Sequence, residues 1–342
     1  MYEKLVTFEE EKRKEHLYLL FNSIFICASL MTVFETVFKF PLLMFSGIQN
    51  SSVKWFITTL LNPVCSSGAA LFPFLIYNIR QQTPFKDKLK ASKDKASPFW
   101  YVFGIISVIC IVPVSVYGGQ LFCDFLIGQG YELSEKLPDM GEGIVANVFY
   151  AIYTSAISAF LLELAFRGVV CHKLSYASTA LAIILPSLIS ALYAYSFVKI
   201  PYLFVSGLII SWCYLKTKSL YLTMAMNFAA NVSFCVTLLL RENTDLLPLS
   251  VICAVISLVA FAVLAVKNGL KVKYPEPKNE DEKYERLTKK EAFFGPFKSF
   301  AFWIFVFIFL FQVFFTYLDK PMPSTDDSAG QTQSGTLVEE GM

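Results

Sequence analysis

Four polar residues stand inside otherwise apolar stretches of this chain, at spacings that place them on common helix faces. Glu163 and Arg167 are four residues apart in LLELAFRGVV, and Asn227 and Asn231 are four apart in SLYLTMAMNFAAN. Residues at i and i+4 lie on the same face of a helix, so each pair presents two polar groups together. Ionisable groups are costly inside a membrane, and each one there is a candidate functional residue.

The two pairs are expected to lie at the same depth. Glu163 is seven residues from Val170, and Asn227 is eight from Ser219. Val170 and Ser219 lie at the ends of their apolar stretches that are expected to face the cytosol. At a rise of ~1.5 Å per residue, Glu163 and Asn227 both lie roughly 10–12 Å inside that boundary. The four side chains could therefore line one buried polar pocket. The alternative is a purely structural hydrogen bond between two helices, worth about 1 kcal/mol. The spacing does not decide between the pocket and the structural hydrogen bond.

Other polar and sulfur-containing residues are expected to be structural. Glu35 and Lys39 have the same i,i+4 spacing near the end of the first apolar stretch, where Lys39 can reach water and form a local ion pair. The eight cysteines form no C-x-x-C pair, and the only histidines are His16 and His172. This pattern predicts neither a disulfide framework nor a metal site, and nothing in it calls for a cofactor.

The elements that must position these residues are membrane spans. Hydrophobic residues make up 55% of the chain and charged residues 16%, against about 25% in soluble domains. A span needs about 20 apolar residues. The sequence predicts an all-α polytopic membrane protein with eight to nine transmembrane helices. The candidate spans are 17–40, 54–79, 99–128, 145–170, 177–198, 201–215, 219–240, 249–266 and 299–318.

The distribution of basic residues predicts the orientation and the division of the chain. Alternate threading of the spans places 23 of the 29 Lys and Arg residues on one side, which should be cytosolic. The N-terminal segment 1–16 is then cytosolic, and the transmembrane core spans 17–266. A cytosolic linker at 267–298 follows, whose Phe293, Phe294 and Phe297 should dip into the lipid interface. One more helix, at 299–318, precedes an external, disordered tail at 319–342.

A resemblance covers residues 145–240. The stretch from Ala159 to Phe234 resembles the CAAX-protease and bacteriocin-processing (CPBP) family of intramembrane glutamic endopeptidases. Its first motif, EExxFRG, reads Leu162-Glu163-Leu164-Ala165-Phe166-Arg167-Gly168 here. The later family run is matched by KIPY at 199–202 and by GLIISWCYLKTKSLYLTMAMNFAAN at 207–231. The resemblance implies an intramembrane-protease-like helical core, in which a motif glutamate activates water with the help of two histidines.

Three of the implied catalytic groups are missing. Leu162 occupies the position of the activating glutamate. The third motif, HxxxN, has Asn227 in place of its histidine and keeps Asn231. The second motif, FxxxH, should fall within 190–197, where no histidine occurs and where Tyr193 or Tyr195 is the nearest polar substitute. An amide donates a hydrogen bond but does not shuttle a proton near neutral pH. The candidate site residues are therefore those of a degenerate site: Glu163, Arg167, Asn227 and Asn231.

Three functions remain open from the sequence. The first is a catalytically defective member of the protease scaffold that binds a membrane peptide or a partner protein. The second is an active endopeptidase that uses Glu163, and the third is a transporter or channel-like subunit. The lipid bilayer and a membrane peptide or protein are the expected partners, and nucleic acid is not. The resemblance also implies a multi-pass protein of the cell membrane.

Overall fold

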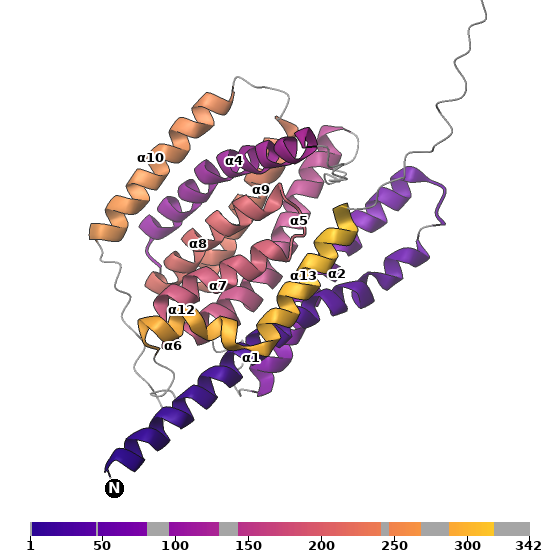
Figure 1. The fold of residues 1–342 in the computed structure, drawn as a ribbon. Helices are drawn as coiled ribbons and strands as arrows, with labels where there is room; N and C mark the ends of the chain where they lie inside the picture. The colour runs from indigo at the N-terminus through magenta and orange to yellow at the C-terminus, as the bar shows by residue number, and fades with distance from the viewer. Residues whose placement is uncertain are drawn as a thin grey trace, which may run out of the picture.

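The computed structural model describes residues 2–45, 47–80, 96–129, 143–240, 246–267 and 287–317, which are almost entirely helical and contain no strand (Figure 1). The prediction of an all-α protein is confirmed. The loop at 81–95, most of the 267–298 linker and the tail after Tyr317 lie outside the described residues. The helices are α1 Tyr2–Met44, α2 Ser51–Arg80, α4 Pro98–Gly128, α5 Ile144–Ala165, the π-helix η1 Phe166–Cys171, α6 His172–Ala177, α7 Thr179–Leu192, α8 Lys199–Thr217, α9 Leu220–Leu239, α10 Leu246–Lys267, α12 Lys289–Lys298 and α13 Phe300–Tyr317.

The helices occupy the predicted stretches, but fewer of them qualify as spans. Six helices of the described part are long and apolar enough to cross a membrane, and the bent pair α12–α13 raises the number to seven. The expected span at 177–198 is the clearest difference. Its helix, α7, ends at Leu192 after 14 residues, and Tyr195 then takes a left-handed conformation with φ of 46°. The predicted eight to nine spans included this stretch, whose helix is shorter than the ~20 residues that a span needs.

Prolines lie within two of the spans. Pro63 and Pro73 lie within α2, which nevertheless runs without interruption from Ser51 to Arg80. Pro201 lies in the first turn of α8, where its missing N–H would have no partner in the helix. The helix therefore starts before the proline, at Lys199, and reaches 19 residues. This span is longer than the 201–215 expected from the sequence.

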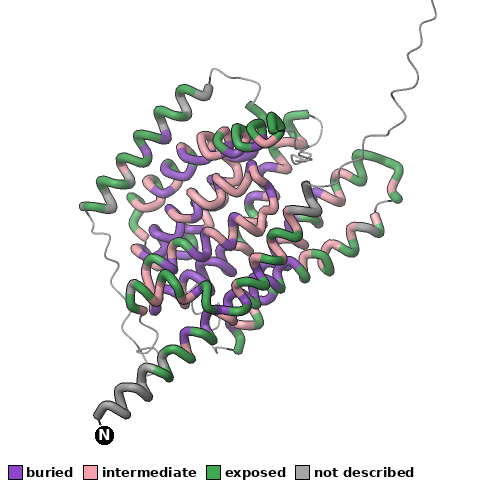
Figure 2. Tube along the Cα trace, viewed as in Figure 1, coloured by how far each residue is buried: buried purple, intermediate pink, exposed green. Residues whose placement is uncertain are grey.

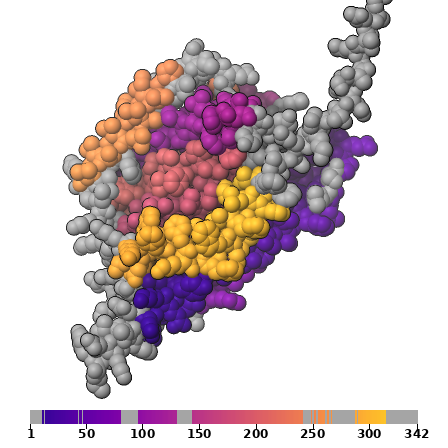
Figure 3. Space-filling view, in the orientation of Figure 1, coloured from indigo at the N-terminus to yellow at the C-terminus, as the bar shows by residue number. Residues whose placement is uncertain are grey.

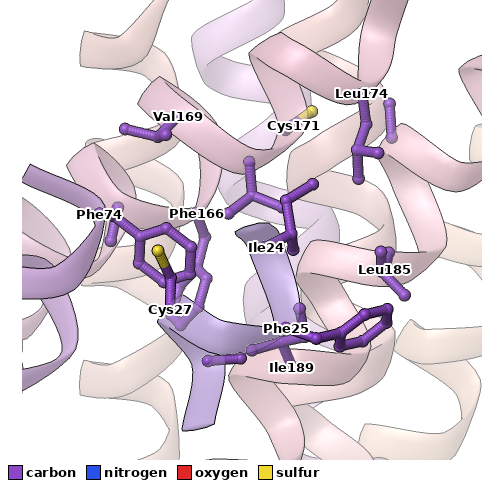
Figure 4. Packing of buried hydrophobic residues seen from close by; sticks show 14 of the residues in the cluster. Ile24, Phe25, Cys27, Phe74, Phe166, Val169, Cys171, Leu174, Leu185 and Ile189 are labelled. Carbon is purple, nitrogen blue, oxygen red and sulfur yellow. The ribbon is translucent and has the colours of Figure 1, made fainter. Parts of the chain in front are cut away.

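Two apolar clusters hold the bundle together. The first joins α1, α2, α7 and the α5–η1–α6 segment, where Phe25, Phe74 and Phe166 pack with Ile189 (Figure 4). The second joins α4, α8 and α9 through residues such as Val112 and Met226. Helix α9 packs against α4, α5 and α8. Buried positions gather in this central part, whereas α10 and α13 expose much of their length (Figure 2).

Candidate functional site

A buried ion pair lies where α5 passes into the π-helix. Glu163 stands in the last turn of α5, and its side chain has no exposed surface. Nη1 of Arg167 lies 2.8 Å from Oε1 of Glu163, and Nη2 donates to the carbonyl of Gly207 at 3.2 Å. Arg167 lies within η1, and single turns of π-helix are frequent at functional sites. The segment thus places a charged pair inside the bundle, with α8 supplying a third partner.

Two asparagines on α9 extend this pair into a chain of hydrogen bonds. Nδ2 of Asn227 donates to Oε1 of Glu163 at 2.7 Å, and Nδ2 of Asn231 donates to Oδ1 of Asn227 at 3.1 Å. The hydroxyl of Tyr202, on α8, donates to Oδ1 of Asn231 at 3.4 Å. The structure therefore brings together all four candidate residues, from α5, η1 and α9, in one chain of hydrogen bonds.

Gly207 is needed for this arrangement because α8 crosses α7 at close range. A Cβ atom at this position would lie 2.9 Å from Cβ of Ser187 and 3.2 Å from its Cα. Real Cβ contacts essentially never fall below 3.0 Å, so a larger residue would push the two helices apart. The same residue exposes its carbonyl to Arg167, and the close crossing thereby fixes the guanidinium.

A polar cavity of about 600 Å³ adjoins the site. Hydroxyl and amide side chains from α2, α5 and α9 form much of its wall, together with Lys199 and Tyr202 of α8. The lining residues are Leu42, Trp55, Thr58, Thr59, Asn62, Pro63, Ser66, Ser67, Tyr150, Thr154, Ser155, Ser158, Lys199, Tyr202, Asn231, Phe234 and Cys235.

Only one of the four candidate residues reaches this cavity. Asn231 is part of its wall, whereas Asn227, Glu163 and Arg167 are not among the residues that line it. The expectation that all four line one pocket therefore differs from the structure in a specific way. The hydrogen-bonded connection from the carboxylate to the cavity wall runs through two amides. Oε2 of Glu163 has no hydrogen-bond partner among the described residues, so the carboxylate keeps one acceptor unused.

The tyrosines considered as substitutes for the second motif histidine lie elsewhere. The hydroxyl of Tyr193 donates to the carbonyl of Ser66 at 2.8 Å, and that of Tyr195 bonds Thr32 at 2.5 Å. Both belong to a polar group between α1, α2 and the α7–α8 connection, where Ser66 also donates to Glu35. Neither tyrosine hydroxyl is bonded to the chain of groups around Glu163.

The residue at the first motif position and the nearest histidine have other recorded neighbours. Leu162 is half-buried and packs against the first apolar cluster. Nδ1 of His172 lies 3.4 Å from the hydroxyl of Tyr214, and its ring contacts Tyr176 edge-on. No group of three or more His, Cys, Asp or Glu side chains gathers within the described ranges in a way that could hold a metal.

This arrangement can hold a ligand more readily than it can move protons. Peptide hydrolysis needs a base for water and an acid for the leaving amine. Here the carboxylate already accepts hydrogen bonds from Arg167 and Asn227, and the groups that connect it to the cavity wall are amides. Amides donate and accept hydrogen bonds without exchanging protons at neutral pH.

Sequence reasoning missed Tyr202, Gly207 and the cavity-lining hydroxyls of α2 and α5. Tyr202 and Gly207 fall within the matched runs at 199–202 and 207–231, which gave a signal for their position but not for their contacts. The hydroxyls gave no signal, since Ser and Thr in an apolar helix commonly bond their own backbone. Thr154 does so, donating to the carbonyl of Tyr150 at 2.7 Å.

Comparison with known proteins agrees with the family resemblance. Residues 144–233 match the family model described as type II CAAX prenyl endopeptidase Rce1-like. The match starts with α5 and ends within α9, so it contains both polar pairs, the π-helix and the whole of α8. Neither the curated proteins nor the solved structures contain a match to this chain.

Proposed function

Because residues 144–233 are Rce1-like, we propose that this multi-pass membrane protein keeps the CAAX-protease scaffold but binds a membrane peptide or protein segment without cutting it. One observation carries the proposal: Glu163 is not part of the cavity wall, and the hydrogen bonds that connect it to that wall run through Asn227 and Asn231. A water held against the cavity wall would therefore contact Asn231 and not the Glu163 carboxylate.

The missing groups argue in the same direction. A well-placed general acid or base contributes about 10²–10⁴ in rate, and this site lacks the motif glutamate and both motif histidines. Glu163 stands one residue after the activating position, which turns it by about 100° around the helix. Its partners are Arg167 and Asn227, so its role is to tie α5, η1 and α9 together.

The cavity supplies the binding chemistry. Its volume of about 600 Å³ falls within the range of ligand pockets, roughly 300–1,000 Å³. Its hydroxyls and amides match the N–H and C=O groups of an extended peptide, and Lys199 adds a positive charge for an acidic group. An extended peptide segment that enters the bundle has backbone groups that need hydrogen-bond partners, and a wall of this composition can supply them.

The cavity occupies the half of the bundle that we expect to face outward. Its walls come from the start of α2, the first half of α5 and the last turns of α9, whereas the basic 80–98 loop adjoins the other end of α2. From the distribution of basic residues we propose that the N-terminus is cytosolic, that the C-terminus is external and that the protein resides in the cell membrane. Cysteine labelling of intact cells tests the orientation: a probe at residue 328 should react, and one at residue 92 should not.

Binding is tested with a photo-crosslinking side chain at one of two positions on α5. Thr154 lines the cavity, and Phe160, 49% exposed on the outer surface, is the matched control. The full chain in lipid nanodiscs is incubated with a fluorescent peptide that carries a farnesylated CAAX-type C-terminus, the substrate class in the family's name. We expect saturable crosslinking at position 154 that unlabelled peptide abolishes.

Two outcomes would contradict the proposal. Equal crosslinking at positions 154 and 160 would mean that the peptide only partitions into lipid. Release of a shortened peptide by the unmodified protein would favour an active endopeptidase instead.

A transporter has less support, because the cavity wall along α5 stops at Ser158 and the asparagine pair closes its inner end.

A further inference from the structure

The short helix α12 packs against α1 and is held in place at both of its ends. Helix α12 begins with a capping box, in which the hydroxyl of Thr288 accepts from the backbone N–H of Glu291 and the Glu291 carboxylate accepts from Thr288. The N–H of Leu287 donates to the carbonyl of Ala177, the last residue of α6, at 3.0 Å. At the other end, Ser299 donates to Asn22 of α1 at 2.6 Å.

The direction of α12 differs sharply from that of α13. The two helices meet at Ser299 with a bend of 66°, so α12 lies across the bundle end while α13 runs alongside α1 (Figures 1 and 3). Phe293, at the outer side of α12, is 67% exposed. A short helix with exposed aromatic side chains beside an apolar span is typical of a membrane interface.

Between α1 and α12 runs a groove of about 660 Å³. Its floor is apolar and includes Leu17, Phe21 and Phe294. Gly295 makes the close approach possible, because a Cβ there would lie 2.7 Å from the ring of Phe21. The full lining is Lys14, Leu17, Tyr18, Phe21, Leu287, Lys290, Glu291, Phe294, Gly295, Phe297 and Lys298.

The charges around this groove are unbalanced. Three lysines, Lys14, Lys290 and Lys298, line it, and none takes part in an ion pair between described residues. The single acidic residue of the lining, Glu291, already accepts hydrogen bonds from Thr288 through Oε2. The groove therefore combines three ammonium groups with an apolar floor, and it lies at the end of the bundle that the basic residues mark as cytosolic.

We propose that this groove is a binding site for an anionic phospholipid of the cytosolic leaflet. The phosphate would lie among the three lysines, and an acyl chain would follow Leu17, Phe21 and Phe294 into the membrane. Each Lys or Arg near this surface raises the affinity for anionic headgroups by about five-fold. The apolar floor distinguishes a lipid from a free anion, because inorganic phosphate would leave that floor uncovered.

The test is lipid retention by the full chain, measured by native mass spectrometry after exchange into mixed phosphatidylglycerol and phosphatidylcholine nanodiscs. The wild type should retain phosphatidylglycerol selectively. The K14Q/K290Q/K298Q variant should lose on the order of 100-fold in apparent affinity at low salt, as three losses of about five-fold multiply. An R80Q/K173Q/K216Q variant removes the same charge elsewhere on the expected cytosolic side and should retain the lipid.

Two further arms separate the groove from simple surface charge. Phe294→Gln keeps every lysine and should still weaken lipid retention several-fold, whereas 50-fold excess inorganic phosphate should not displace the lipid. The proposal is overturned if both triple variants lose lipid equally, or if phosphate displaces it as well as phosphatidylglycerol does. Circular dichroism and gel filtration of each variant establish that the helices and the monodisperse state are intact.

Discussion

Replacing Arg167 by methionine isolates the contribution of the buried ion pair. The side chains of Arg167 and Glu163 are 2% and 0% exposed, so the substitution leaves a carboxylate buried without its counter-charge. Removing one partner of a buried pair costs about 3–5 kcal/mol. The chain contains a matched control, since Lys39 and Glu35 form an i,i+4 pair whose lysine is 40% exposed. Lys39→Met should cost under about 1 kcal/mol.

The assay is the free energy of unfolding of each purified variant in bicelles. A double variant, E163Q/R167M, sharpens the test because a neutral glutamine can still accept from Asn227 without a buried charge. It should be more stable than R167M alone, with a coupling of about 1–3 kcal/mol between the two substitutions. The reasoning is refuted if R167M costs no more than K39M, or if the effects of the two substitutions simply add.

Three further substitutions probe the surroundings of the carboxylate. Asn227→Leu removes the 2.7 Å hydrogen bond to Glu163 and should lower the free energy of unfolding in bicelles by about 1–3 kcal/mol. Gly207→Ala forces α8 away from Ser187 and should cost a similar amount, about 1–3 kcal/mol, with weaker peptide crosslinking at position 154. Leu162→Glu restores the activating glutamate, yet it should give no turnover in a fluorogenic peptide assay, because both motif histidines are still missing.

The architecture could be predicted from hydropathy because each span had to satisfy its backbone groups as a helix in lipid. The convergence of Glu163 and Asn227 followed from equal depth, and the hydrogen bond between them places them as that argument expected. Composition does not indicate where a helix ends. The end of α7 at Leu192 depends on the left-handed Tyr195, a residue type that carries no strong turn signal.

The sequence could not predict which of the site residues line the cavity and which contact Glu163. That Asn231 faces the cavity and Asn227 faces Glu163 depends on the rotation of α9 against α5 and α8, which tertiary packing sets. The crossing at Gly207 and the π-helix at Phe166–Cys171 both affect this rotation, and neither has a reliable signal in one sequence. The tyrosines of the α7–α8 connection were considered near the site for the same reason, and packing placed them by α1 and α2.

Peptidase turnover by the full chain distinguishes a binding scaffold from an active protease. The protein in nanodiscs is incubated with a farnesylated CAAX-type peptide, and mass spectrometry follows the products beside a Glu163→Gln variant of verified fold. We predict that neither protein releases a fragment above the peptide-only background, although the wild type binds the peptide. Cleavage by the wild type that is lost in the folded Glu163→Gln variant would contradict the account and establish an active protease.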